Sequence, residues 1–322
     1  MAYFHISKFA FTCRLLVLIP AIAYGQNYPD RPIRIVTSEP GGGLDFAARL
    51  IAQGIAGSLG QPVVVDNRGP GGVVAIEAVA RAQPDGYTLL LYASTIWLAP
   101  LMRDNVPWDP VRDFSPVTLT TRSPNLIVVH PSVPANSLRE LIALAKSKPG
   151  DLNYGSGAVG SPSHLAAELF KYMVGVNIVR ISYKSAGPAL SSLISGHVHL
   201  MFATAGGVVP HVKSGKLRAL AITSATRSAL MPNLPTAAAS GAPGYEAVSL
   251  VTIFAPAQTP PARINRLNQE IVRFLGTAEA REQFFSAGVE TVGSSPEQLA
   301  ATMKSEMVRM GKVIKDAGIR EE

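Results

Sequence analysis

Short apolar runs alternate with glycine-containing turns and helical stretches through the first hundred residues of the chain. The runs at 33–36, 63–65 and 88–92 have the length and composition of buried strands. The stretches between them, at 46–59 and 73–82, have helical character. The order strand, helix, strand, helix, strand predicts a parallel sheet covered by helices on both faces.

The same alternation resumes after a proline-rich and less regular passage at 100–116. Ser137 and Glu140 form a capping box that opens a helix, and Pro149 and Gly150 stop it. A second α/β unit is therefore expected. The pattern of this unit and of the C-terminal part predicts strands at 126–129, 153–155, 178–181, 198–202, 218–222 and 248–254. It predicts helices at 137–147 and 161–172, a helix that begins near 188, a helix after 259–260, and a last helix from 295–296 to about 315.

A loop with three consecutive glycines, 41–43, joins the first predicted strand to the first predicted helix. Glycine permits backbone angles that a side chain forbids, and it lets a ligand approach the amides closely. The first N–H groups of the helix lack intrahelical partners and have the positive end of the helix dipole behind them. The stretch from Ser38 to Asp45 therefore predicts an anion site made of backbone, suited to a carboxylate or a phosphate.

Polar residues after other strands extend this candidate site. Ligands of parallel sheets bind at the carboxyl ends of the strands. If the first three strands are parallel, Ser94 and Thr95 lie at the same edge as Ser38 and Gly43. Thr204, which follows the run at 198–202, is a further candidate ligand-binding residue.

Two loops in the second half also deliver backbone amides to helix starts. The glycine-rich loop 155–160 runs into Ser161, a favourable N-cap, and a proline stands at the first helical position. His164 falls in the first turn of that helix, where it can face the cleft. Loop 183–188 turns into a helix that begins near Pro188.

The length, the composition and the N-terminal segment predict an exported protein of about two domains. The 322 residues, 47% of them hydrophobic, are enough for about two domains with proper cores. Lys8 and Arg14 precede an apolar run at 15–23, which predicts a cleavable signal peptide over residues 1–25 and export to the periplasm. The single cysteine, Cys13, lies within that segment and before the apolar run, so it is badly placed for a lipid anchor. The mature chain then has no disulfide and no thiolate metal site.

The net charge favours small anions as partners. The formal charge is +7 with a pI near 9.6, and loss of Lys8 and Arg14 lowers the charge to about +5. The basic residues stand singly, without interleaved aromatics, which speaks against nucleic-acid binding. A weak positive field that attracts small anions fits better.

One motif supports an alternative function. Gly155, Gly157 and Gly160 match the dinucleotide fingerprint after a strand and before a helix. The acidic residue expected about 20 positions later is missing, although Arg180 in that region could meet a 2′-phosphate. The alternative is thus an exported NADP-type dinucleotide-binding protein or enzyme.

Other chemistry finds little support in the pattern. His197, His199 and His211 supply too few ligands for a metal site. Ser156 is not in a nucleophile elbow, because Tyr154 stands where that motif needs glycine. We therefore expect no metal, no cofactor and no catalysis.

Taken together, the loops give the chain a family resemblance. It resembles the substrate-binding receptors of tripartite tricarboxylate transporters, often called Bug receptors, over essentially its whole mature length. Many stretches match in the right order, which is far more specific than one glycine loop. They include EPGGGLDFAARL (39–50), LGQPVVVDNRGPGG (59–72), PDGYTLL (84–90), WDPVRDFSPV (108–117), YGSGAVGSPSHLAAELF (154–170), YKSAGPAL (183–190), SGKLRALAITSATRS (214–228) and FAPAQTP (254–260).

The resemblance implies an α/β, two-domain periplasmic binding protein-like fold (type II-like), in which each domain is a mostly parallel sheet flanked by helices and the ligand cleft lies between the domains. Domain 1 would combine residues 26–125 and 249–322, and domain 2 would span 126–248, with hinge crossings near Leu126 and Val248. Such a receptor, expected as a monomer, closes around a small organic acid or acidic amino acid. It passes this solute to the membrane subunits of a transporter, or signals through a membrane sensor.

The resemblance also implies which residues hold the ligand. Main-chain amides of two loops would bind it, often through water, and Asp45 would cap its own helix. Carried onto this chain, the binding residues are Gly43, Leu44 and Asp45 on one side and Ser185, Ala186 and Gly187 on the other, with Ser156, Ser161 and His164 in the remaining matched loop.

Four residues depart from the family pattern. Thr37 and Glu39 stand where proline is common, Ser185 replaces a common glycine, and Leu250 replaces a frequent tryptophan. A carboxylate at Glu39 facing the cleft would repel an acidic ligand or pair with a ligand amine.

Overall fold

The computed structural model describes Met1 and residues 28–320, apart from residues 39, 70 and 71. The predicted signal peptide and Glu39 lie outside the described residues. Among those described, the chain forms an α/β fold with a mixed sheet, as the following bounds show.

The strands are β1 (Ile33–Thr37), β2 (Val63–Asn67), β3 (Thr88–Ala93), β4 (Phe114–Val129), β5 (Asn153–Ser156), β6 (Val179–Ser182), β7 (Leu200–Thr204), β8 (Arg218–Ile222), β9 (Val248–Pro256) and β10 (Glu290–Thr291). The helices are α1 (Gly43–Leu59), α2 (Val73–Ala80), α3 (Thr95–Met102), α4 (Leu138–Ser147), α5 (Pro162–Val174), α6 (Ala186–Ile194), α7 (Ala205–Lys213), α8 (Pro261–Leu275), α9 (Ala278–Ser286) and α10 (Pro296–Asp316).

The strands follow the order β2-β1-β3-β9-β4-β7-β5-β6, and β8 and β10 also pair with β4. β1 pairs in parallel with β2 and β3, and β5 pairs in parallel with β6 and β7. The parallel arrangement expected for the first three strands is confirmed. The two central strands, β4 and β9, run antiparallel to their neighbours, so the sheet is parallel at its outer ends and antiparallel in the middle.

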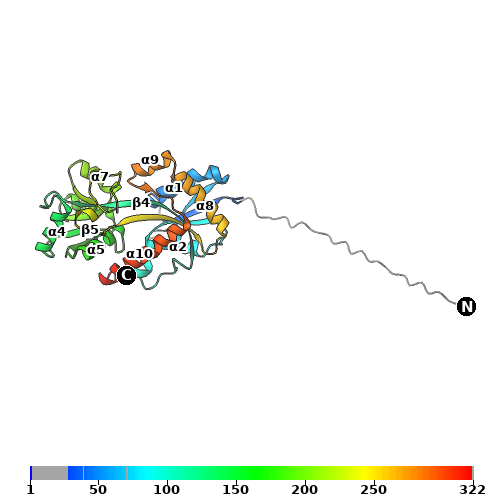
Figure 1. The fold of residues 1–322 in the computed structure, drawn as a ribbon, viewed down its shortest axis with the longest axis horizontal. Coiled ribbons are helices and arrows are strands. Elements are labelled where there is room, and N and C mark those ends of the chain that lie inside the picture. The colour runs from blue at the N-terminus through cyan, green and yellow to red at the C-terminus, as the bar shows by residue number, and fades with distance from the viewer. Residues whose placement is uncertain (2–27, 39, 70–71, 321–322) are drawn as a thin grey trace.

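β4 connects the two halves of the molecule. It is 16 residues long, whereas the apolar pattern predicted a strand only at 126–129. The part of β4 before residue 126 was not predicted because it contains Pro116 and Pro124. Proline donates no hydrogen bond to a neighbouring strand, so it weakens the sequence pattern of a strand. β4 pairs with β9 as far as Pro124 and with β7 from Asn125 onward. In Figure 1, β4 and the yellow strand β9 run from one half of the molecule into the other.

These halves form two lobes, which confirms the expected two-domain class (Figure 1). The first lobe is built on β1, β2, β3 and β10 with α1, α2, α3, α8 and α9. The second lobe is built on β5, β6, β7 and β8 with α4, α5, α6 and α7. Helix α10 contacts α3 of the first lobe and α5 of the second. One buried apolar cluster accordingly contains Trp97 of α3, Phe170 of α5 and Met310 of α10.

Three helices, α3, α7 and α9, were not predicted from the pattern. α3 is buried on most sides, so it lacks the polar face that marks an amphipathic helix. α7 opens with Gly206 and Gly207 and contains Pro210, three residues that disfavour a helix in isolation. Helix α1 begins at Gly43 and not at the predicted residue 46, so Gly43, Leu44 and Asp45 form its first turn.

Candidate functional site

A cleft between the lobes contains two large cavities of about 490 Å³ each. Thr204 and Gly207, at the start of α7, line both cavities and therefore join them. We call them the second-lobe cavity and the glycine-loop cavity. The second-lobe cavity is lined by Asn125, Gly157, Ala158, Ser161, Pro162, Ser163, Lys184, Ser185, Ala186, Gly187, Leu190, Met201, Phe202, Ala203, Thr204, Gly207 and Val208. The glycine-loop cavity is lined by Gly41, Gly42, Gly43, Leu44, Phe46, Ala47, Ala93, Thr121, Ser123, Thr204, Gly206, Gly207, Ser249, Val251, Phe284, Ala287 and Val289.

Gly43 and Leu44 bring the start of α1 to the glycine-loop cavity. The N-cap residue Gly42 has no side chain, so no side-chain hydrogen bond caps this helix. Gly41 has a φ of 83°, in the left-handed region that favours glycine, which turns the chain from β1 into α1. The first-turn amides of α1 thus lack both intrahelical partners and a side-chain cap.

Asp45 turns away from the cavity and binds its own loop. Its carboxylate accepts hydrogen bonds from the Gly41 amide at 2.9 Å, from Arg49 Nε at 3.0 Å and from Asn67 Nδ2 at 2.9 Å. The hydrogen bond from Arg49, with those from Gly41 and Asn67, lowers the pKa of Asp45 to about 2. Ser38 is joined to the same network, because its carbonyl accepts from Asn67 Nδ2 at 2.8 Å. Neither Ser38 nor Asp45 is among the lining residues of the two cavities.

The starts of α6 and α7 face the second-lobe cavity. Ser185 and Thr204 are their N-cap residues, and neither side chain caps its helix. Ala186 and Gly187, in the first turn of α6, line the cavity. Among the other helices, α4, α9 and α10 do receive side-chain caps, from Ser137, Thr277 and Ser295. The starts of α1, α6 and α7 at the cleft therefore lack side-chain caps, a property that they share with α2, α3, α5 and α8 but not with these three helices.

The loop between β5 and α5 forms another wall of the second-lobe cavity, with Gly157, Ala158 and Ser161. Ser156 and His164 are buried behind this wall. His164 Nδ1 accepts from the Gly160 amide at 3.1 Å, so Nδ1 carries no proton in this arrangement. Burial, together with the charges of Arg180 and Lys171, lowers the pKa of His164 to about 4, so the ring is neutral at pH 7. Both buried residues shape the loop and do not line the cavity.

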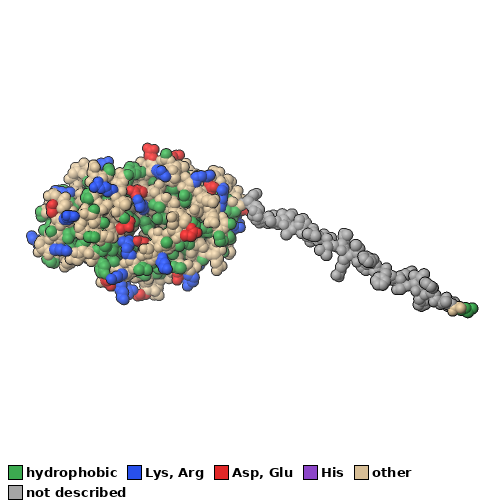
Figure 2. Space-filling model, in the orientation of Figure 1, with side chains coloured by type: hydrophobic (Ala, Val, Ile, Leu, Met, Phe, Trp, Pro, Cys, Tyr) green, Lys and Arg blue, Asp and Glu red, His purple; other side chains and the backbone are tan. Residues whose placement is uncertain are grey.

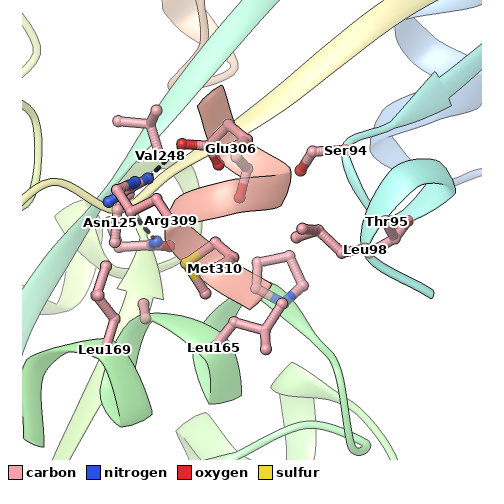
Figure 3. Close-up of a pocket in the computed structure, with 14 residues that line it drawn as sticks. Ser94, Thr95, Leu98, Asn125, Leu165, Leu169, Val248, Glu306, Arg309 and Met310 are labelled. Atoms are coloured by element: carbon pink, nitrogen blue, oxygen red, sulfur yellow. Dashed lines mark hydrogen bonds and ion pairs between the residues drawn. The ribbon is translucent and has the colours of Figure 1, made fainter. Parts of the chain in front are cut away.

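Ser94 and Thr95 lie on a different side of the cleft. They line a pocket of about 40 Å³ between α3, α5 and α10 (Figure 3). In this view Glu306, Arg309 and Met310 project from α10 between Ser94 and the crossing strands. Thr95 also borders a cavity of about 180 Å³, which it shares with Ala158 and Ser161. Ser94 and Thr95 are therefore not among the lining residues of the two large cavities, although their pocket shares Asn125 and Pro162 with the second-lobe cavity and Ser249 with the glycine-loop cavity.

The large cavities carry little charge. Among their described lining residues, Lys184 is the only charged side chain, and none is acidic. Most of the remaining lining is apolar, with Phe46, Phe284 and Val251 on the first-lobe side and Met201 on the other. A solute in this space would meet backbone amides, hydroxyls, apolar walls and one cation.

Several residues that line the cavities were not predicted from the sequence. Lys184 lies in the predicted loop 183–188, but the ligand residues expected in that loop are Ser185, Ala186 and Gly187. Gly207 follows a strand and opens a helix, the signal used for the other loops, so it could have been found. Asn125 and Ser123 lie inside the connecting strand β4, where no local pattern marks them.

A two-lobed α/β fold with a solute-sized cleft lined by helix amides defines a solute-binding receptor. The chain belongs to the tripartite tricarboxylate transporter family receptors, whose family model matches residues 47–319, and this is a family of periplasmic receptors. Protein BugT of Bordetella pertussis is 38% identical over 306 residues, which cover 94% of each chain.

Solved structures agree in sequence and in fold. The structure of R. palustris Rpa4515 with adipate is 38% identical with a TM-score of 0.78, and the match covers 91% of this chain and 99% of that one. The structure of MatC (Rpa3494) from Rhodopseudomonas palustris with bound malate is 30% identical with a TM-score of 0.72, covering 89% and 100%. The family resemblance expected from the sequence is thus confirmed.

Three findings complete the description. Among the described residues, no helix combines the length and the apolar character that crossing a membrane requires. Within the same part of the chain, no group of three or more His, Cys, Asp and Glu side chains is arranged to hold a metal ion. On the face drawn in Figure 2, Lys and Arg side chains are scattered over both lobes and do not gather in one patch.

Proposed function

We propose that this protein captures a small carboxylate-bearing solute between its two lobes and delivers it to a tripartite tricarboxylate-type transporter. The observation that carries the proposal is the set of helix starts without side-chain caps, those of α1, α6 and α7, at one pair of joined cavities whose described lining residues include no acidic side chain. Amides at helix starts are well suited to bind a carboxylate, since the helix dipole adds to their hydrogen bonds. Adipate and malate, bound by two family members, are carboxylates of suitable size.

The direct ligand groups in this proposal are the amides of Gly43 and Leu44 on the first lobe and those of Ala186 and Gly187 on the second. Ser161, Ser185 and Thr204 add hydroxyls at the cavity walls. Asp45, Ser156 and His164 hold the loops in place, with Ser38 in the same network as Asp45. Ser94 and Thr95 line the small pocket at the side of the cleft that α10 borders.

The remaining parts of the proposal concern the chain as a whole. A cleaved leader over residues 1–25 would bring the monomeric protein to the periplasm, where it contacts the membrane subunits of its transporter and catalyses no reaction. The domain boundaries near 125/126 and 248/249 are supported by the change of β4 partner between Pro124 and Asn125. Family membership favours this receptor over the NADP-type alternative.

A thermal-unfolding screen of the mature chain from Gln26 tests the proposal. The panel holds adipate, malate, other mono-, di- and tricarboxylates, acidic amino acids and NADP. A ligand at 100 times its dissociation constant stabilises by about 2.7 kcal/mol, which raises the midpoint of a chain of this size by about 4 °C. A shift with carboxylates supports the receptor. A shift with NADP alone would overturn it in favour of the glycine fingerprint.

A further inference from the structure

Arg180 on β6 differs from most arginines of this protein in its hydrogen-bond partners. Its guanidinium donates from Nε to Ser156 Oγ at 2.8 Å and from Nη2 to the Gly157 carbonyl at 2.9 Å and to Ser182 Oγ at 3.1 Å. All three acceptors are uncharged. Among the described residues, no ion pair includes this half-buried side chain, whereas Arg49, Arg122 and Arg309 each pair with a carboxylate.

The nearby acid does not neutralise Arg180, because it already has a partner. Glu168 lies in the same region, as its effect on the buried His164 ring shows. Its carboxylate accepts from Lys171 Nζ at 2.8 Å and from the Tyr154 hydroxyl at 2.5 Å. The positive charge of Arg180 is therefore left uncompensated behind the loop between β5 and α5.

Only the Gly157 peptide group lies between the guanidinium of Arg180 and the second-lobe cavity. Gly157, whose carbonyl Arg180 holds, lines the cavity beside the start of α6. The two segments approach closely, since a Cβ on Gly157 would lie 3.5 Å from the Ala186 nitrogen and 3.3 Å from Ser161 Oγ. A carboxylate bound to the amides of α6 would thus lie on the other side of the Gly157 peptide from the guanidinium.

On the first-lobe side, the described lining residues of the glycine-loop cavity are all uncharged and offer no equivalent cation. The nearest arginine in that loop network, Arg49, is already paired with Asp45 at 3.0 Å. Around the two large cavities, the positive charges of the described residues, Arg180 and Lys184, therefore lie at the second lobe.

We propose that Arg180 is a positioning residue for the anionic end of the solute. It fixes the Gly157 peptide and adds an unpaired positive charge to the helix-amide site, so that the solute binds with a carboxylate toward the second lobe. This inference rests on the proposed function and assigns a role to a residue that contacts the loop and not the solute.

Binding measurements with two substitutions separate charge from shape. Arg180→Gln removes the charge but keeps a hydrogen-bond donor, and Arg180→Lys keeps the charge but loses the fork geometry. Arg218→Gln is the matched control, because Arg218 is also half-buried in the second lobe and, among the described residues, donates to the carbonyls of Val133 and Ala135 alone, at 3.2 and 3.0 Å. The probes are adipate and malate, followed by whichever panel acid stabilises the wild type most, and calorimetry at 20 and 200 mM NaCl gives the dissociation constants.

We expect Arg180→Gln to weaken binding about tenfold at low salt, the size of one partly screened charge at short range. Its affinity will also depend less on salt than that of the wild type. Arg180→Lys will stay within about threefold of the wild type, and Arg218→Gln will bind as the wild type does. A second readout needs no ligand: an NMR titration of His164 will show a higher pKa in Arg180→Gln, because one positive charge near the ring has gone.

Other results would overturn the inference. If Arg180→Gln binds like the wild type at both salt concentrations, the charge does not reach the solute, although the receptor function would stand. If Arg180→Lys is as weak as Arg180→Gln, only the shape of the loop matters. An unchanged His164 titration would show that the charge of Arg180 does not act across the loop between β5 and α5. If the wild type binds no carboxylate at all, this inference falls together with the proposed function.

Discussion

At the scale of single residues, the side chains that shape the cleft lie behind its walls. Asp45 and His164 both accept hydrogen bonds from amides of their own loops, those of Gly41 and Gly160. Each is buried and neither lines a large cavity. Their contribution to binding is therefore indirect, through the position of the loops.

Replacing Asp45 with Asn will loosen the loop before α1. The charged acceptor of the Gly41, Arg49 and Asn67 donors is lost, which we expect to lower the free energy of unfolding by about 1–2 kcal/mol, since Arg49 is half-exposed and solvent screens the ion pair. The depressed pKa makes this contribution fully present above about pH 4 and lost as the pH falls toward 2. Urea unfolding of both proteins at pH 7 and pH 2.5 measures the difference, which should shrink at the lower pH. An equal difference at both values would contradict the assignment.

His164 will titrate near pH 4 in an NMR experiment, well below the usual value of about 6.5. Because the folded-state pKa lies below the unfolded one, protonation favours the unfolded chain. The stabilisation by the neutral ring is thus present above about pH 6.5 and is lost as the pH falls toward 4, by about 3 kcal/mol. In a His164→Gln variant, which keeps an acceptor for Gly160, this part of the pH dependence should disappear. A midpoint near 6.5 in the wild type would show that the ring is exposed in solution.

At the scale of elements, the starts of α6 and α7 decide how the cleft binds and closes. The N-cap Ser185 is extended, with φ −155° and ψ 175°, and the amide after it belongs to the first turn. At the start of α7, Gly206 packs against the backbone of residues 287 and 288 in the first lobe. One helix start thus offers amides, and the other touches the opposite lobe.

Ala186→Pro will test a single amide as a ligand group. Proline suits the first helical position, and an extended preceding residue such as Ser185 is compatible with it. The variant should keep its unfolding midpoint within about 2 °C while losing about 10- to 100-fold in carboxylate affinity, the effect of one charge-assisted hydrogen bond. Ala186→Ser, which retains the N–H, serves as the control. Unchanged affinity in the proline variant would exclude this amide from the site.

Gly206→Ala will hold the lobes apart. The added Cβ would lie 2.5 Å from the Ala287 carbonyl oxygen, a backbone atom that cannot yield without moving its lobe. We expect about tenfold weaker binding and a larger radius of gyration in X-ray scattering with ligand present. Gly57→Ala in α1, where the new Cβ would meet nothing within 4 Å, is the matched control and should leave both quantities unchanged. If the two variants behave alike, the contact between α7 and residues 287–288 does not limit closure.

At the scale of the whole molecule, several connections cross between the lobes. Glu290 on β10 accepts from Arg122 Nε of β4 at 2.8 Å and from the hydroxyl of Ser228, which follows β8. Arg309 of α10 donates to the carbonyl of Glu246 at 2.6 Å, beside the second crossing of the chain. Together with the buried cluster that α10 shares with both lobes, these contacts join the lobes into one unit.

The chain will therefore unfold in one cooperative transition. Trp97 and Trp108 report on the first lobe through fluorescence, and hydrogen exchange of β5 and β6 reports on the second. Both probes should give the same urea midpoint, and a saturating carboxylate should raise both equally. Two separate midpoints would mean that each lobe is stable by itself and that the shared core contributes little.

The sequence by itself determined the alternating α/β order, the loops that join strands to helices and the family. These are local properties: apolar runs of strand length, glycines before helix starts and N-cap residues all act within a few positions of the chain. Ser161 and Ser295, for example, stand at the N-caps of α5 and α10 as predicted. Gly43, Ser185 and Thr204 could be named as cavity candidates because each lies at such a junction.

Only the tertiary structure decided which strand-to-helix loops come together at the cleft and which side chains pack behind them. Burial of His164, the sharing of Asp45 among three donors and the position of Ser94 in the pocket beside α10 depend on packing between segments far apart in sequence. Pro124 and Asn125 are neighbours in one strand, yet they pair with strands of different lobes, a difference that no local pattern encodes. The unpaired charge of Arg180 likewise became visible only when β5 and β6 were placed side by side, because a charge is compensated or left free by its neighbours in space.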